Sequence, residues 1–114
     1  GIQRLALGAN AIENEGMEEL TQVLPQCQDL EHLDLRGNLI GDEGATFLAE
    51  ILAECPMLTS VDLHLNHIGI EGVGSLADVL PDCTALLQLD LAENEFGAEG
   101  AGRLAAVLGA CRLT

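Results

Sequence analysis

The sequence contains no lysine, tryptophan or tyrosine, and its only aromatic residues are Phe47 and Phe96. A hydrophobic core must therefore be built from aliphatic side chains, and 48% of the 114 residues are hydrophobic. No apolar run is long enough to cross a bilayer, and the first residues lack the basic segment that begins a secretory signal. We therefore expect a single domain that neither spans nor binds a membrane.

Basic residues are equally scarce. Four arginines stand against 19 aspartates and glutamates, so the formal net charge is −15. Nucleic acids and anionic lipids are bound by basic groups that neutralise phosphate, so this composition argues against both as partners. An acidic surface attracts basic partners, which predicts a basic protein partner. The simpler alternative is that the acidity only keeps the protein in solution.

A period of 28 residues runs through the whole chain. Asparagine, cysteine, glycine and glutamate each recur at this spacing, and chance does not give four unrelated residue types one period. The recurring residues are Asn10, Asn38, Asn66 and Asn94; Cys27, Cys55, Cys83 and Cys111; Gly16, Gly44, Gly72 and Gly100; and Glu15, Glu43, Glu71 and Glu99. The period predicts a repeat protein with units of about 1–28, 29–56, 57–84 and 85–114.

Each unit has the pattern of one strand followed by one helix. In the second unit, residues 32–36 alternate polar and apolar side chains, which is typical of a strand. Residues 45–52 carry apolar side chains at helical spacing, which predicts one apolar stripe on a surface helix. Glu43 falls in the first turn of that helix, where a negative charge meets the positive end of the helix dipole.

One strand and one helix cannot enclose a core, so the units must stack side by side, with parallel strands on one face and helices on the other. Equivalent side chains then form buried columns. These are Leu5, Leu33, Val61 and Leu89; Leu7, Leu35, Leu63 and Leu91; and Ile12, Ile40, Ile68 and Phe96. The four asparagines should form a ladder, since a buried amide can bond backbone groups that a tight turn leaves unpaired.

These motifs resemble a known family. The pattern L-x-L-x-x-N-x-I-G-x-E-G is clearest from Leu35 to Gly44, and L-A-x-x-L follows at Leu48 to Leu52 and at Leu76 to Leu80. Over essentially its whole length the chain resembles ribonuclease-inhibitor-like leucine-rich repeats, as found in ribonuclease inhibitor, NOD-like receptors and the GTPase-activating protein for Ran. The resemblance implies an α/β leucine-rich-repeat solenoid, a horseshoe arc with strands on the concave face and helices on the convex face. It also implies protein binding on the concave or edge surfaces.

The concave face supplies the candidate partner-binding residues. Asp34, Asp62 and Asp90 should form a close row, because neighbouring strands lie about 4.8 Å apart, and this row could receive lysine or arginine from a partner, or a cation. The full candidate set is Arg4, His32, Asp34, Arg36, Asp62, His64, Gln88 and Asp90. Arg36 is the best single anchor, since arginine often anchors interfaces. The alternative is that these charges are simply solvated.

Other chemistry is not supported by the sequence. The four cysteines share one position after the helix, too far apart for disulfides, so we expect buried thiols in an intracellular protein, cytoplasmic or nuclear. Asp62, His64 and His67 lack a zinc spacing, and without lysine there is no phosphate-binding P-loop. We therefore expect no metal, no cofactor and no catalytic activity.

The predicted function is that of a protein-interaction or scaffold module. Two alternatives remain open: an architectural segment of a larger assembly, and a small-GTPase regulator of the Ran-activator type. Neither end of the chain carries a distinct polar cap, which predicts a segment of a longer protein or an oligomer that stacks end to end.

Overall fold

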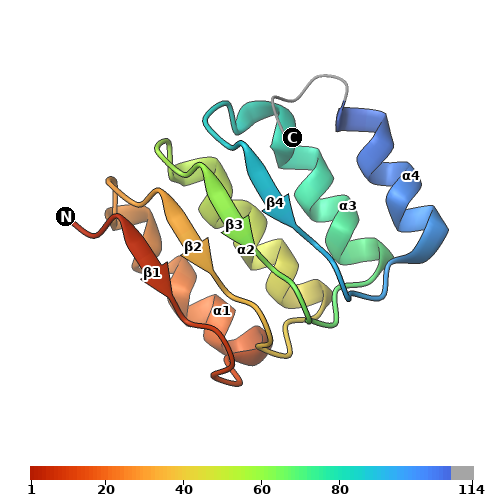
Figure 1. The fold of residues 1–114 in the computed structure, drawn as a ribbon, viewed down its shortest axis with the longest axis horizontal. Coiled ribbons are helices and arrows are strands. Elements are labelled where there is room, and N and C mark those ends of the chain that lie inside the picture. The colour runs from red at the N-terminus through yellow and green to blue at the C-terminus, as the bar shows by residue number, and fades with distance from the viewer. Residues whose placement is uncertain (109–114) are drawn as a thin grey trace.

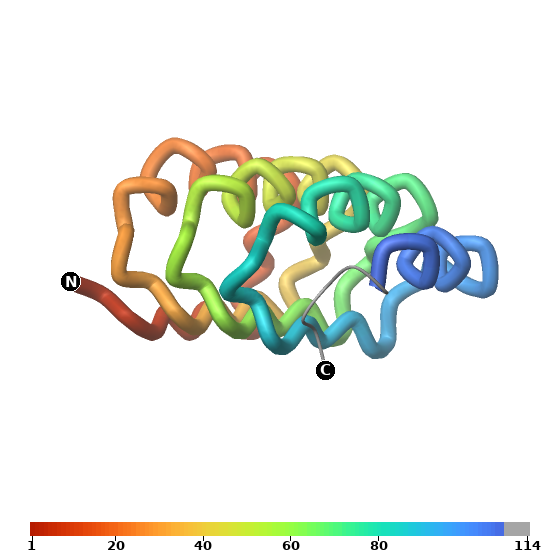
Figure 2. The backbone as a smooth tube through the Cα atoms, turned by 90° about the horizontal axis from the view of Figure 1, so that it is seen from above, coloured from red at the N-terminus to blue at the C-terminus, as the bar shows by residue number. Residues whose placement is uncertain are grey.

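A computed structural model describes residues 1–108, which form a stack of four strand–helix units (Figure 1). The strands β1 (Arg4–Ala6), β2 (His32–Asp34), β3 (Ser60–Asp62) and β4 (Gln88–Asp90) make one parallel sheet in that order. The helices are α1 (Glu13–Thr21), α2 (Asp42–Glu54), α3 (Ile70–Val79) and α4 (Gly97–Leu108), with short 3-10 helices η1 (Leu24–Gln26) and η2 (Leu80–Asp82). Seen from above, strands and helices form two separate layers (Figure 2). The predicted α/β solenoid is confirmed.

The strand register follows the sequence period. Leu5 pairs with Leu33, Leu33 with Val61, and Val61 with Leu89. The interior columns are no more than 2% exposed at Leu33, Leu35, Ile40, Val61, Leu63 and Ile68. Their equivalents in the first and fourth repeats are only partly buried, because each has a neighbouring repeat on one side. None of the helices within residues 1–108 combines the length and apolarity needed to cross a bilayer.

The recurring asparagines join each repeat to the one before it. Asn66 is 3% exposed, and its Oδ1 accepts hydrogen bonds from the backbone N–H groups of Asn38 at 2.9 Å and Ile40 at 3.0 Å. Its Nδ2 donates to the carbonyls of Leu35 at 3.2 Å and Leu63 at 3.0 Å. Asn38 repeats this arrangement one unit earlier. Each buried amide thus satisfies the backbone of two repeats.

Asn10 stands at the first position of the same series but is exposed. Its Nδ2 donates only to the carbonyls of Leu7 at 2.8 Å and Gly8 at 3.2 Å, within its own turn.

We therefore predict that Asn66→Ala lowers the free energy of unfolding by about 1–3 kcal/mol, because backbone groups inside the stack lose their partners. Urea denaturation measures this, with Asn10→Ala as the matched control expected to cost less. Equal losses for the two variants would contradict the role of the interior amide.

The N-terminal ends of α2 and α3 are capped by side chains from the preceding repeat. Gly41 and Gly69 occupy the N-cap positions and have no side chain to serve there. Asn14 Oδ1 instead accepts from the N–H groups of Gly41 and Gly44, both at 2.8 Å. Asp42 Oδ1 accepts from Gly69 at 2.6 Å and from Gly72 at 3.0 Å. These contacts tie each helix start to the previous unit.

The capping contact also explains a recurring glycine. A Cβ atom at Gly72 would lie 2.8 Å from Asp42 Oδ1 and 2.9 Å from Ile68 Cγ2. The position therefore makes room for the cap and for the isoleucine side chain.

The next cap in the series is missing, because Ile70 stands where Asp42 would recur. Helix α4 consequently begins differently: Gly97 has a φ of +58°, and the Gly100 N–H donates to the carbonyl of Phe96 at 3.0 Å. At the capped helices, by contrast, φ is −103° for Gly41 and −102° for Gly69. Whether a preceding side chain is present thus selects between two ways of starting the helix.

We predict that Asp42→Ala destabilises the domain by about 0.5–2 kcal/mol, the usual range for a lost N-cap, because two N–H groups of α3 lose their acceptor. Thermal and urea unfolding measure the loss. Asp42→Asn is the matched control, since its amide oxygen can still accept both bonds. If Asp42→Asn destabilised the domain as much as Asp42→Ala, the capping bonds would not be the cause.

Candidate functional site

The candidate partner-binding residues gather on the exposed side of the sheet. Two shallow hollows lie there. The first, of about 190 Å³, is lined by Arg4, Leu5, Ala6, His32, Leu33, Asp34, Ser60 and Asp62. The second, of about 420 Å³, is lined by Ser60, Val61, Asp62, Gln88, Leu89, Asp90 and Leu91. The structure therefore brings six of the eight predicted residues into adjoining hollows, while Arg36 and His64 follow just after β2 and β3.

The aspartates of the row stabilise the fold as well as forming part of the exposed surface. Oδ1 of Asp34, Asp62 and Asp90 accepts a hydrogen bond from the backbone N–H two residues later, at 3.1, 2.9 and 3.0 Å respectively. These bonds close the turn that leaves each strand. Oδ1 of each carboxylate is thus bonded within the fold, and Oδ2 is the oxygen that a partner could contact.

The three aspartates differ in that second oxygen. Asp34 Oδ2 lies 3.5 Å from Nε of Arg36, whereas no ion pair joins Asp62 or Asp90 to another residue within 1–108. The exposed Arg36 side chain also lies over the first repeat, because a Cβ at Gly8 would be 3.2 Å from its Cγ and Nε. Arg36, predicted as an anchor, is therefore engaged within its own chain, although such exposed pairs contribute only about 0–1 kcal/mol.

The charge on the concave face consequently changes along the stack. Arg4 and the Asp34–Arg36 pair lie over β1 and β2, whereas Asp62 and Asp90 lie over β3 and β4. His32 and His64 lie among them, and both are partly buried. The negative part of the surface is therefore the part formed by the third and fourth repeats, a distinction that the uniform aspartate row in the sequence did not reveal.

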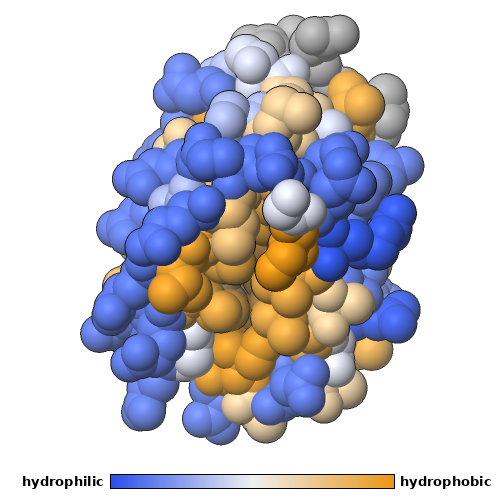
Figure 3. All heavy atoms as spheres, turned by 90° about the vertical axis from the view of Figure 1, so that its left-hand side faces the viewer, coloured by the Kyte–Doolittle hydropathy of each residue, from blue (hydrophilic) through white to orange (hydrophobic). Residues whose placement is uncertain are grey.

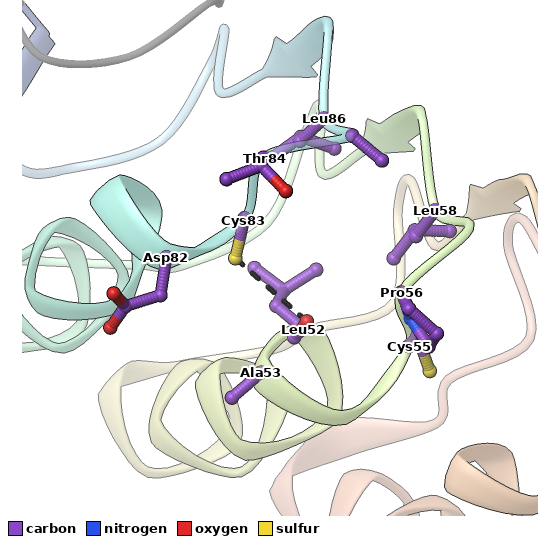
Figure 4. A pocket seen from close by; sticks show the side chains of 10 residues that line it. Leu52, Ala53, Cys55, Pro56, Leu58, Asp82, Cys83, Thr84 and Leu86 are labelled. Atoms are coloured by element: carbon purple, nitrogen blue, oxygen red, sulfur yellow. Dashed lines mark hydrogen bonds between the residues drawn. The ribbon is translucent and has the colours of Figure 1, made fainter.

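A third hollow lies at the helix-to-strand turns. A cleft of about 130 Å³ is bounded by the turns after α2 and η2 and is lined by Leu52, Ala53, Cys55, Pro56, Leu58, Asp82, Cys83, Thr84, Ala85 and Leu86. Figure 4 shows Cys83 Sγ turned toward the Leu52 carbonyl, 3.8 Å away, and Cys55 Sγ turned away from the cleft. Cys55 instead bonds the carbonyl of Leu24 at 3.8 Å.

The cysteines described by the structure, Cys27, Cys55 and Cys83, are free thiols, and Cys111 lies outside the described residues. Burial raises the pKa of the Cys55 thiol, with smaller contributions from Cys27 and Glu54. Only the thiolate is a good nucleophile, so a raised pKa lowers the reactive fraction of Cys55 at neutral pH.

We predict that iodoacetamide modifies Cys55 more slowly than Cys27 and that the rate of modification of Cys55 rises at higher pH. Mass spectrometry of peptides after timed alkylation measures both rates, and denatured protein serves as the control in which the difference disappears. A Cys55 that reacts as fast as Cys27 in the folded protein would contradict the effect of burial.

The histidines and carboxylates show no metal centre in the described part of the chain. Within residues 1–108, no group of three or more potential ligands could hold a metal ion. His67 Nδ1 lies 3.2 Å from Oε1 of Glu95, one repeat away, in an exposed pair. The combination of Asp62, His64 and His67 is therefore not brought together as a ligand set.

Comparisons with known proteins agree with this architecture. Among solved structures, the chain is similar to leiomodin-1 actin-binding site 2, with a TM-score of 0.84 and 20% identity over 96% of this chain and 65% of that one. It is also similar to the tropomodulin C-terminal domain of Caenorhabditis elegans, with a TM-score of 0.73 and 12% identity over 96% and 83% of the respective chains. The present chain thus spans less than two thirds of the leiomodin-1 chain, and identities this low show a shared fold alone.

Sequence comparison identifies the family directly. A search of curated proteins found no match. Three segments, residues 26–49, 54–77 and 82–105, match the family model described as Leucine Rich repeat. This match does not separate the ribonuclease-inhibitor-like subfamily from others. Because the three segments make up more than half of its residues, the chain belongs to the leucine-rich-repeat family.

Proposed function

We propose that this domain is a non-catalytic module that binds a protein partner on its concave face, with Asp62 and Asp90 receiving basic side chains. One observation carries the proposal: these carboxylates line the larger concave hollow and form no ion pair with another residue within 1–108. Asp34, by contrast, lies beside Arg36. The free thiols lead us to propose a reducing, intracellular compartment for this binding.

The charge arrangement favours a partner segment that is basic over β3 and β4. Adjacent strands place Asp62 and Asp90 opposite each other in the register of the sheet. Two like charges about 4.8 Å apart reinforce one another's attraction for a cation. Exposed charges mainly raise the association rate and select the partner, and salt screens them, so binding should weaken as ionic strength rises.

We predict that a hexa-arginine peptide shifts the amide resonances of β3 and β4 in heteronuclear NMR titrations. Asp62→Asn/Asp90→Asn should weaken binding several-fold, because each asparagine still closes its turn while the negative charge is lost. The matched control is Glu43→Gln/Glu50→Gln, which removes two exposed charges from α2. Equal weakening by the control, or shifts confined to the helices, would contradict a concave binding site.

Actin is a second candidate partner. The specific observation in its favour is the similarity to leiomodin-1 actin-binding site 2, over 96% of this chain. Titration of fluorescently labelled monomeric actin with the domain tests it. Saturable binding would support actin, and binding lost in Asp62→Asn/Asp90→Asn would also assign the surface. An absence of binding would reject actin and leave the peptide titration as the test of the concave site.

The two remaining alternatives make different predictions. An architectural segment would bind neither the hexa-arginine peptide nor monomeric actin through its concave face. A regulator of a small GTPase is suggested only by resemblance, and stimulation of GTP hydrolysis by Ran would be its signature. The peptide titration separates the concave-binding proposal from both.

A further inference from the structure

Large apolar side chains are exposed in two settings on this stack. At the N-terminal end, Figure 3 shows a hydrophobic centre surrounded by hydrophilic side chains, where the core of the first repeat is only half-buried. Leu39 and Leu65 differ, because they belong to the second and third repeats, which have a neighbouring repeat on both sides. They are 48% and 55% exposed, whereas Ile40 and Leu63, close by in the sequence, are 0% exposed. Their exposure therefore does not come from a missing neighbour.

The two leucines lie at the same edge of the stack, in the turns that follow β2 and β3 (Figure 1). The Gly37 N–H donates to the carbonyl of His64 at 2.9 Å, so these two turns run side by side. Leu65 is thereby placed next to Gly37, which has no side chain to cover it. We call Leu39 and Leu65 the strand-exit patch.

The fold does not require a leucine at either position. The residues equivalent to Leu65 in the other repeats are Ala9, Gly37 and Glu93, and those equivalent to Leu39 are Ala11, His67 and Glu95. Both leucines also have a φ of 59°, in the left-handed region that bulky side chains rarely adopt. Neither burial nor backbone conformation accounts for these side chains, which points to a contact outside the chain.

Carboxylates surround the strand-exit patch. The Leu65 N–H donates to the carbonyl of Ala92 at 3.0 Å, which sets the exposed Glu93 beside Leu65. Leu39 borders a shallow hollow of about 250 Å³, whose other lining residues are Glu13, Asn14 and Glu15. An apolar patch with this acidic surround complements a segment in which apolar side chains stand between basic ones.

We propose that the partner segment bound over Asp62 and Asp90 continues past the ends of β3 and β4 and places apolar side chains on the strand-exit patch. This inference rests on the proposed concave site and adds a requirement to it, because basic residues alone would leave the patch uncovered. Asp62 and Leu65 are three residues apart, so they lie within about 10 Å of each other. The partner segment therefore carries a basic and an apolar residue about three positions apart.

The two kinds of contact respond differently to salt. Salt screens the attraction between the carboxylates and basic side chains, but it does not weaken the burial of apolar surface. The advantage that an apolar residue gives the partner should therefore persist at salt concentrations that lower the affinity as a whole.

Two peptides of equal charge test the proposal by fluorescence anisotropy, at low and raised salt. The leucine peptide is Arg-Arg-Gly-Leu-Leu-Gly-Arg-Arg, and the serine peptide has serine at both leucine positions. The domain should bind the leucine peptide about fivefold more tightly or better, because partial burial of leucine side chains favours binding. Asp62→Asn/Asp90→Asn should weaken the binding of both peptides and keep the preference for leucine.

Leu39→Asn/Leu65→Asn removes the apolar surface, since asparagine is similar in size to leucine and tolerates a left-handed φ. This variant should bind both peptides alike, as tightly as the unmodified domain binds the serine peptide. Met57→Asn is the control: Met57 is 50% exposed at the opposite edge, before β3, and its loss should leave the preference unchanged. Circular dichroism checks folding, and Leu39→Gly/Leu65→Gly replaces the asparagine variant if it does not fold.

Equal affinity of the unmodified domain for the two peptides would overturn the strand-exit contact and leave the concave site standing. Absence of binding by either peptide would reject the concave site and this contact with it. A preference for leucine that survives in Leu39→Asn/Leu65→Asn, or is lost in Met57→Asn, would show that the apolar contact lies elsewhere and would also overturn the proposal.

Discussion

A buried side-chain amide that serves the backbone of two repeats is the interaction on which the structure depends. Each strand has three residues, and backbone hydrogen bonds continue across the joints beyond the strands, as from the Leu35 N–H to the Asp62 carbonyl. Asn38 and Asn66 add bonds that cross the first and second joints and bonds within their own turns, at sites no more than 3% exposed. Without them, backbone groups of the turn would be buried unpaired, at a cost of about 1–3 kcal/mol for each asparagine lost. The asparagines therefore reinforce the stacking register that the backbone hydrogen bonds also hold.

The candidate site is a consequence of that register. Because the turns are held at a constant spacing, the aspartates on successive strands face the same way, and each uses one oxygen to close its turn. What distinguishes them is the residue two positions later: Arg36 lies beside Asp34, whereas His64 and Ala92 follow Asp62 and Asp90. The repeated positions make the surface, and the variable positions give its third and fourth repeats their negative character.

The period predicted the strand pairing, the core columns and the surface to which the candidate residues belong, because residues one period apart are neighbours in a solenoid. It could not predict features that break the period. The caps from Asn14 and Asp42 have no counterpart at Ile70, and their effect on the helix starts appears only in the backbone. Leu65 and Glu93 adopt a left-handed φ of 59°, although only Gly37 in that series is a glycine. The partial exposure of Leu5 and Leu89 reflects missing neighbours, which a pattern of residue types does not report.

Hydrogen exchange at the Ile40 amide tests the central claim most directly, because this N–H belongs to the second repeat while its acceptor, Asn66 Oδ1, belongs to the third. In Asn66→Ala, at a pH and temperature where the domain remains folded, the account predicts faster exchange at Ile40 and Asn38, with helix α1 unaffected. Unchanged protection of Ile40 and Asn38, with faster exchange only around residue 66, would show that the side chain serves its own turn and does not hold the repeats together.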